Sequence, residues 1–154
     1  MAKFSTEVER SVTVKVPLAR VYAYLWDVAG SAECIPGIDS CKRVGDDTYK
    51  FLYEERSTGP VSLTVQYTAR YDGNGKDEIR FEGTAAKGDN TDVSGVLKLK
   101  ASAADATKIS LRQTLAPDTP VPRLLQSLIR SFVEKEAADA AKQYLANIKQ
   151  ALEG

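Results

Sequence analysis

The sequence predicts an α+β fold in which a seven-stranded antiparallel sheet curls around one long C-terminal helix, with two short helices after the first strand. Seven strand-like segments follow one another between residues 4 and 116, and short turn sequences separate most of them. After Pro120 the chain becomes rich in Leu, Ala, Gln, Glu and Lys, which favours a helix over residues 121–152. The 154 residues suit one domain spanning residues 1–154, because single cores usually close at about 100 to 200 residues.

The first strand and the two short helices open the chain. Apolar residues occupy even positions from Phe4 to Val16, the period of a half-buried strand. Pro17 ends that strand and suits the first turn of a helix over residues 18–27, where the missing N–H of proline has no partner anyway. Residues 29–37 contain two glycines and a proline, and we expect a second short helix there before the chain turns.

Six further strands are expected to form a meander. The connections between them are short, which suits antiparallel neighbours and leaves little room for parallel crossovers. Four of these strands keep their large apolar residues on one parity, so one face of the sheet is oily and the other is wet. The expected strands cover residues 39–44, 48–57, 61–72, 77–86, 92–102 and 108–116.

This arrangement predicts an internal cavity. Seven strands about 4.8 Å apart make a sheet roughly 30 Å wide, whereas a helix with its side chains is about 10 to 12 Å across. Curling the sheet around the helix leaves apolar surface uncovered, which suits an apolar or amphipathic small molecule. For any single aromatic ring the alternative is that it simply fills the core. The candidate ligand-binding residues are Phe51, Tyr53, Leu63, Val65, Tyr67, Phe81, Leu97, Leu111, Gln113, Leu128 and Phe132.

The composition excludes several classes of function. The chain has no histidine, which removes Ser-His and Cys-His nucleophile pairs, His-ligated zinc and histidine general bases. Two cysteines, Cys34 and Cys41, are too few for a four-thiolate metal site and are expected to be reduced thiols. No glycine-rich phosphate-binding motif occurs. We therefore expect neither a metal nor a cofactor.

Charge and hydropathy bear on partners and location. Lys plus Arg and Asp plus Glu both number 21, so the net charge of zero gives no basic footprint for nucleic acid. No apolar stretch reaches the length of a signal peptide core or the ~20 residues of a spanning helix. The expected protein is cytoplasmic, without an integral membrane segment.

Four side chains have two interpretations each. Arg10 and Gln113 stand at inward positions of apolar strands, so each is paired within the protein, exposed at an irregular strand, or aimed at ligand or water. Trp26 lies off the apolar stripe of the first short helix and is a candidate shield of the cavity mouth or a partner contact. Glu136 is either a solvated or paired carboxylate or an acid inside the cavity.

The long helix carries two apolar faces, rotated from each other by well over a quarter turn. Either the helix bends near residues 134–136, or its two halves face different surfaces. The first face holds Leu125, Leu128, Ile129 and Phe132, and the second holds Ala137, Ala141, Tyr144, Ile148 and Leu152.

Short motifs follow one another in order along the chain. They are Val14-Lys-Val16-Pro17, Val21-Tyr22-Ala-Tyr-Leu25-Trp-Asp27, Cys34-Ile35-Pro36-Gly37, Gly45-Asp-Asp-Thr-Tyr49 and Gly59-Pro60-Val61. With the order of elements, they resemble the helix-grip architecture of the START-like (SRPBCC) superfamily, which includes polyketide cyclases, lipid-transfer domains and birch-pollen-allergen-like proteins. The resemblance covers essentially the whole chain.

Two groups within that superfamily are most similar. The run from Cys34 to Val61 resembles the accessory subunits of carbon monoxide dehydrogenase, whereas Val121-Pro-Arg-Leu-Leu125 is closer to the cyclases and general lipid-binding members. The sequence departs from the family pattern at Tyr22, where a tryptophan is usual, and it lacks the glycine-containing approach to the last helix that the carbon monoxide dehydrogenase accessory proteins have.

Three functions are then open. A non-catalytic binding or carrier domain for a lipid, quinone or polyketide-like molecule is favoured, because inward acid-base groups are scarce. The resemblance also implies a cyclase or dehydrase that would use tyrosines, carboxylates, Arg10 or Gln113. The third is an accessory role for a redox enzyme such as carbon monoxide dehydrogenase, which would require a protein partner.

Overall fold

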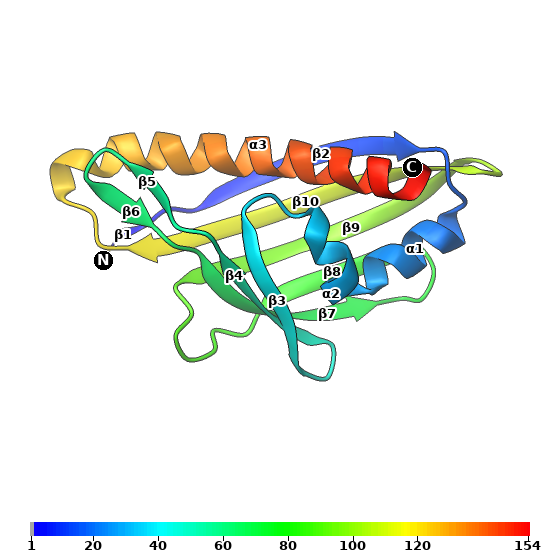
Figure 1. Ribbon diagram of the computed structural model, residues 1–154, viewed down its shortest axis with the longest axis horizontal. Helices are drawn as coiled ribbons and strands as arrows, with labels where there is room; N and C mark the ends of the chain where they lie inside the picture. The colour runs from blue at the N-terminus through cyan, green and yellow to red at the C-terminus, as the bar shows by residue number, and fades with distance from the viewer. Residues whose placement is uncertain (1) are drawn as a thin grey trace.

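The structure, a computed structural model, describes residues 2–154. One long helix, α3 (Gln126–Glu153), lies along the inner face of an antiparallel sheet, and two short helices, α1 (Leu18–Trp26) and α2 (Val28–Ser31), lie at one end (Figure 1). Single 3-10 turns at Ala32–Cys34 and Arg123–Leu125 follow α2 and precede α3. The α+β class and the predicted helix-grip arrangement are confirmed.

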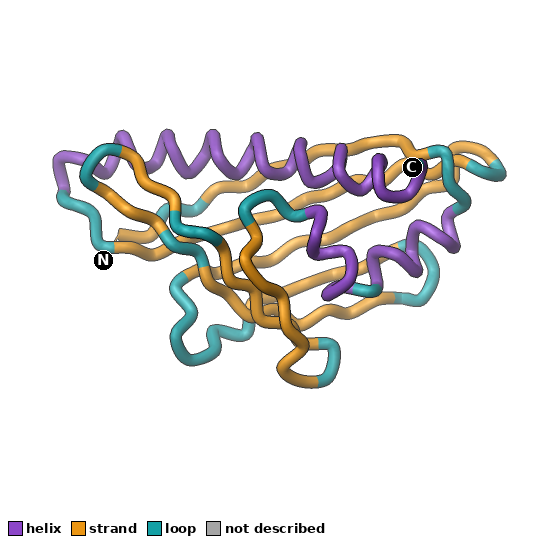
Figure 2. The backbone as a smooth tube through the Cα atoms, viewed as in Figure 1, coloured by secondary structure: helices purple, strands orange, loops and turns teal. Residues whose placement is uncertain are grey.

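The strands fill seven positions in the sheet. β1 and β2 lie end to end along β10 in one continuous register, and then β9, β8, β7, β4 and β3 follow, every neighbour antiparallel. The short helices therefore carry the chain from one edge of the sheet, β2, to the other edge, β3 (Figure 2). The strands are β1 (Ala2–Lys3), β2 (Thr6–Val14), β3 (Ile38–Gly45), β4 (Thr48–Tyr53), β7 (Gln66–Gly73), β8 (Glu78–Gly83), β9 (Thr91–Ala103) and β10 (Ala106–Thr119).

Two of the expected strands are each broken in two. The strand expected over 48–57 divides into β4 and β5 (Arg56–Thr58), and the strand expected over 61–72 divides into β6 (Val61–Leu63) and β7. β5 and β6 pair only with each other, as a separate two-stranded hairpin. Figure 1 shows this hairpin bent away from the main sheet toward the first turns of α3.

A β-bulge explains the break. β4 and β7 are paired as far as Leu52 and Gln66, and pairing resumes between Arg56 and Leu63. Three residues of the first strand, 53–55, thus stand opposite two of the second, 64–65, which bends the ribbon. The extra residue also moves Arg56 onto the face that carries Leu63, toward α3. The period-two pattern could not reveal this, because it runs unbroken through residues 61–71.

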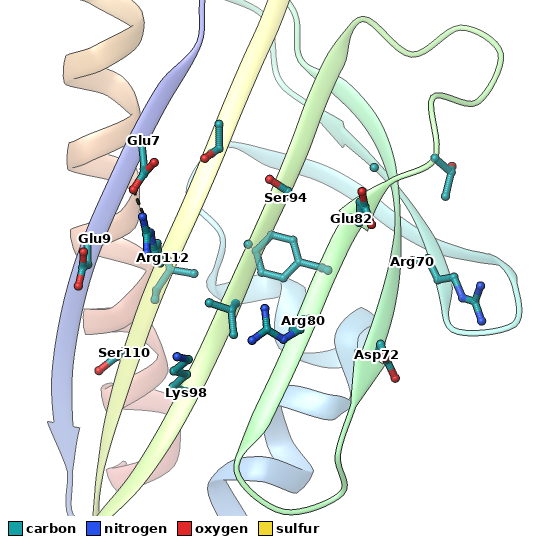
Figure 3. Close-up of a pocket in the computed structure, with 17 residues that line it drawn as sticks. Glu7, Glu9, Arg70, Asp72, Arg80, Glu82, Ser94, Lys98, Ser110 and Arg112 are labelled. Atoms are coloured by element: carbon teal, nitrogen blue, oxygen red, sulfur yellow. Dashed lines mark hydrogen bonds and ion pairs between the residues drawn. The ribbon is translucent and has the colours of Figure 1, made fainter.

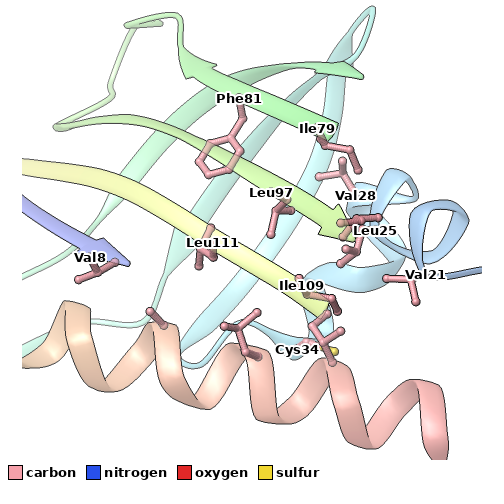
Figure 4. Packing of buried hydrophobic residues seen from close by; sticks show 14 of the residues in the cluster. Val8, Val21, Leu25, Val28, Cys34, Ile79, Phe81, Leu97, Ile109 and Leu111 are labelled. Atoms are coloured by element: carbon pink, nitrogen blue, oxygen red, sulfur yellow. The ribbon is translucent and has the colours of Figure 1, made fainter. Parts of the chain in front are cut away.

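Buried apolar side chains form two clusters. The larger one fills the space between the main sheet, the short helices and the C-terminal half of α3. Figure 4 shows Phe81, Leu97 and Leu111 pointing from their strands toward that helix. The smaller cluster lies beneath the β5–β6 hairpin and consists of Phe4, Val61, Leu63, Ile129 and Val133.

Helix α3 is continuous, and its two halves face different surfaces. Its buried residues recur mainly every four positions, from Ile129 through Val133 and Ala137 to Leu145. Because four residues turn an α-helix by about 400°, the buried stripe advances about 40° per step and passes from the hairpin to the sheet without a bend. The first face proposed for this helix was wrong except at Ile129, since Leu128 is 53% exposed. No helix within residues 2–154 has both the length and the apolar character needed to cross a membrane.

Candidate functional site: a cavity lined by tyrosines

An internal cavity of about 110 Å³ lies between the inner face of the sheet, the short helices and the C-terminal half of α3. An apolar cavity of about 150 Å³ can hold benzene, so this space is close to the size of one six-membered ring. None of the residues that line it, all of which belong to the described chain, carries a charge. Those that the sequence proposed as ligand-binding are Phe51, Tyr53, Tyr67, Phe81, Leu97, Leu111 and Gln113.

Four proposed residues lie elsewhere. Leu63 belongs to the smaller cluster under the hairpin, and Val65 is half-buried between the two clusters. Leu128 points to solvent, and Phe132 is half-buried but absent from the cavity wall. The bulge at residues 53–55 is the physical reason, because it turns the chain after β4 toward α3, whose N-terminal half packs on the hairpin.

Sequence reasoning missed the helical part of the wall. Ala137, Ala140, Ala141 and Tyr144 of α3 line the cavity, together with residues of α1, α2 and the following turn. The alanines matter because their short side chains leave space between the helix and the sheet. The signal was present in the second apolar face of the helix, but small residues there are equally typical of close packing. The other wall residues outside the proposal are Leu25, Val28, Ser31, Ala32, Ile35, Pro36, Tyr71 and Leu115.

Gly95 allows Phe81 to form one wall. The two residues are cross-strand partners in β8 and β9. A Cβ atom at Gly95 would overlap the tip of the Phe81 ring and would stand 2.7 Å from the carbonyl oxygen of Arg112. The missing side chain therefore lets the phenylalanine ring lie across β9 toward Leu111 and Gln113, as in other cases where an aromatic ring covers a strand glycine.

Stacked aromatic rings give the cavity flat walls. The ring centroids of Phe51 and Tyr67 are 4.9 Å apart, and those of Tyr71 and Phe81 are 5.4 Å apart, both in stacked geometry. The hydroxyls of Tyr53 and Tyr67 share a hydrogen bond of 2.8 Å. Offset aromatic pairs of this kind stabilise a core beyond the area they bury.

The cavity tyrosines remain protonated at neutral pH. Burial raises the pKa of Tyr53 to about 12, although the hydrogen bond from Tyr67 lowers it in part. Burial also raises the pKa of Tyr67, Tyr71 and Tyr144 well above the usual value near 10. These four groups are therefore neutral phenols, able to donate and accept hydrogen bonds.

An ion pair lies at the rim of the cavity. Nη2 of Arg56 donates to Oε2 of Glu136 at 2.7 Å, and the backbone N–H of Glu54 donates to the carbonyl of Gly37 at 2.8 Å. Pro36 and Ala137, the chain neighbours of Gly37 and Glu136, line the cavity. Glu136 is thus a paired surface carboxylate, 38% exposed, and not an acid inside the cavity.

Trp26 and Arg10 have structural roles outside the cavity. The indole of Trp26 stacks on Tyr22 with a centroid distance of 6.2 Å, and both side chains cover Gly73, where a Cβ would overlap the Tyr22 hydroxyl. That hydroxyl accepts from the backbone N–H of Gly75 at 2.9 Å, which fixes α1 against the end of β7. Trp26 therefore does not shield the cavity mouth. Arg10 is exposed, and its Nη1 donates to the carbonyl of Glu9.

Both cysteines are free thiols. The hydroxyl of Tyr24 lies 3.3 Å from the sulfur of Cys34, and Nδ2 of Asn147 donates to the Cys34 carbonyl at 2.9 Å. Burial raises the pKa of Cys34 and raises that of Cys41 to about 11. Since the thiolate is the reactive form, neither thiol is activated as a nucleophile.

A larger hollow of about 960 Å³ lies on the outer face of the sheet (Figure 3). This is the wet face that the strand parity predicted. Four cations and four carboxylates line it, and one pair is joined by the 2.9 Å contact between Nε of Arg112 and Oε1 of Glu7. Solvated, balanced charges do not favour an apolar ligand, so the internal cavity is the better candidate site. The charged residues are Glu7, Glu9, Arg70, Asp72, Arg80, Glu82, Lys98 and Arg112.

The antiparallel sheet around a C-terminal helix, closed at one end by two short helices over an apolar cavity, defines the START-like class. Within that class, the chain belongs to the family described as polyketide cyclase / dehydrase and lipid transport, whose model matches residues 5–153. No curated protein matches the chain.

Solved structures share the fold over nearly the whole chain. A START superfamily protein from Mycobacterium smegmatis is 12% identical, with a TM-score of 0.73 and coverage of 96% of this chain and 97% of that one. The Zhui aromatase/cyclase from Streptomyces sp. R1128 is 17% identical, with a TM-score of 0.73 and coverage of 97% and 94%. DR_A0006 from Deinococcus radiodurans is 20% identical, with a TM-score of 0.66 and coverage of 96% and 98%. At such identities the likeness establishes the fold alone.

Proposed function

We propose that this protein is a cytosolic binding or carrier domain that holds an apolar or amphipathic small molecule in its internal cavity. The observation that carries the proposal is an enclosed space whose wall is aliphatic and aromatic and includes no charged side chain. Transfer of apolar surface from water into such a space is favourable by about 25 cal/mol per Å². The two free cysteines accord with a reducing compartment.

The size of the cavity limits the ligand. About 110 Å³ admits roughly one ring without rearrangement. A lipid, a quinone with a tail or a polyketide-like chain would place the remainder of the molecule elsewhere, and the nearest exit is the rim beside Arg56 and Glu136. That part of the wall combines a turn, Ile35–Gly37, with the ion pair between β5 and α3.

A cyclase or dehydrase is the second candidate, and the family that the chain belongs to supports it. The specific observation in its favour is the set of neutral phenols on the cavity wall, which can donate hydrogen bonds to a substrate carbonyl. We favour binding because no carboxylate, amine or histidine lines the cavity to remove a proton. An accessory role beside a redox enzyme, with a protein partner, stays a prediction.

The experiment compares a filled cavity with an open one. Ethylbenzene, a single apolar ring, is titrated into the full chain and followed by amide chemical shifts and by the melting temperature. Binding should be saturable and should raise the melting temperature of the wild type. Ala141→Leu fills the cavity from α3 and should abolish both effects, whereas Ala146→Leu adds the same atoms to the exposed face of that helix and should preserve them. Unsaturable shifts in the wild type would refute the proposal.

A further inference from the structure

We propose that the cavity selects an uncharged, ring-sized molecule that bears a carbonyl oxygen, a ketone or a quinone, and that the hydroxyls of Tyr71 and Tyr144 hold that oxygen. The proposal rests on the binding function above and names its ligand chemistry. It is argued from an account of the hydrogen-bond donors and acceptors on the cavity wall.

Tyr71 and Tyr144 have hydroxyls without a partner. Among residues 2–154 no hydrogen bond joins either group to the protein, although both side chains line the cavity. Only Thr68 and Asp118 hold a side-chain oxygen that is sealed from space and also unpaired within the same residues. The two phenol hydroxyls therefore reach accessible space, and the cavity is the space that both of them line.

The wall offers more free protons than free acceptors. Tyr53 and Tyr67 are bonded to each other, so one donates while the other keeps its own proton for a further partner. The Ser31 hydroxyl already donates to the carbonyl of Asp27 at 2.9 Å. Three phenol protons thus remain, from Tyr71, from Tyr144 and from the bonded pair. A ligand that only accepts hydrogen bonds satisfies them best.

The electrostatics of the wall favour a neutral ligand. No charged side chain lines the cavity, so a carboxylate or an ammonium group would be desolvated without a counter-ion. Burial raises the pKa of Tyr71 and Tyr144, which keeps both as proton donors at neutral pH. A carbonyl oxygen is an acceptor that needs no counter-ion.

The shape of the wall favours a flat ring. The stacked pairs Phe51–Tyr67 and Tyr71–Phe81 present planar surfaces, and the volume of about 110 Å³ matches one ring. A ring with a carbonyl group attached to it or within it would contact these surfaces while its oxygen meets the phenol hydroxyls.

The test compares two ligands of similar shape on two forms of the protein. Acetophenone carries the carbonyl oxygen, ethylbenzene lacks it, and both are titrated into the full chain by NMR. Removal of two hydrogen-bond donors in Tyr71→Phe/Tyr144→Phe should weaken acetophenone about tenfold and leave ethylbenzene unchanged. Benzoate, an anion of the same size, should not bind either form.

A matched control and a fallback keep the result interpretable. Tyr49→Phe removes a phenol hydroxyl just outside the cavity, beside Tyr71, and should change neither affinity. Should the double variant fail to fold, Tyr144→Phe alone should weaken acetophenone about threefold. Equal losses for both ligands, or benzoate binding as tightly as acetophenone, would overturn the selection of a neutral carbonyl. If neither ring binds the wild type, the proposed function itself fails.

Discussion

The two halves of α3 use the same framework for opposite ends. Beneath the β5–β6 hairpin, Ile129 and Val133 fill the space against Phe4, Val61 and Leu63, and a sealed cluster results. Further along the helix, alanines occupy the corresponding inward positions and a cavity of about 110 Å³ remains. The difference teaches that the size of the inward helical side chains decides whether this fold makes a core or a pocket.

Alkaline pH should produce the largest effect, and it acts through the cavity half alone. The smaller cluster contains no titratable side chain, whereas the cavity half buries four phenols. Their folded pKa values are raised above the unfolded value near 10, so the stability they contribute is fully present below pH 10. It is lost as pH rises through the folded value, about 12 for Tyr53.

The measurement is a spectrophotometric titration of the tyrosines with circular dichroism in parallel. The cavity phenols should ionise only as the protein unfolds, above pH 10. Ionisation of all seven tyrosines near pH 10 with the fold intact would show that the cavity is open to water.

Ile129→Ala should give the next largest effect. Removal of a fully buried isoleucine from the sealed half should lower the free energy of unfolding by about 2 to 5 kcal/mol. Ligand affinity should be unchanged, because Ile129 does not line the cavity. Urea denaturation measures the first and an ethylbenzene titration the second. A loss below about 1 kcal/mol would mean that this half is as loosely packed as the cavity half.

Gly95→Ala should sharpen the comparison from the cavity side. The added Cβ overlaps Phe81, so the ring must leave its place on the wall, at a cost of about 1 to 3 kcal/mol in unfolding free energy. Ligand binding should weaken at the same time. Ser94→Ala, on the exposed neighbour in the same strand, serves as the control and should change neither quantity by a measurable amount.

Arg56→Ala should have the smallest effect on stability. The Arg56–Glu136 pair joins the two halves at the rim, but its side chains are 54% and 38% exposed. Exposed pairs contribute about 0 to 1 kcal/mol, and denaturation should register no more than that. Ligand exchange, measured by NMR line shape, should become faster because the contact between β5 and α3 is lost. Unchanged exchange would place the ligand's exit elsewhere.

The sequence predicts the framework better than the site. Alternating residues such as Val61, Leu63 and Tyr67 define the oily face, and the change of composition after Pro120 defines the long helix. The bulge at residues 53–55 leaves no mark on that alternation, because the partner strand keeps its parity throughout. For that reason Leu63 and Val65 were wrongly placed at the cavity.

The missed tyrosines show a second limit. Tyr71 shares the inward parity of Tyr67, and Tyr144 lies on the second apolar face of α3, but only the tertiary structure brings them to one cavity. Alanines such as Ala141 suit either tight packing or open space. Which of the two occurs depends on the distance between helix and sheet, and the residue pattern does not specify that distance.

Xenon binding in a crystal tests the central claim most directly, because xenon enters apolar cavities large enough to hold it and leaves packed cores empty. In crystals under xenon pressure, the account predicts xenon between Phe81 and Ala141, and none among Phe4, Leu63 and Ile129 beneath the hairpin. Xenon beneath the hairpin, or none between Phe81 and Ala141, would contradict the division of this protein into a sealed half and a binding half.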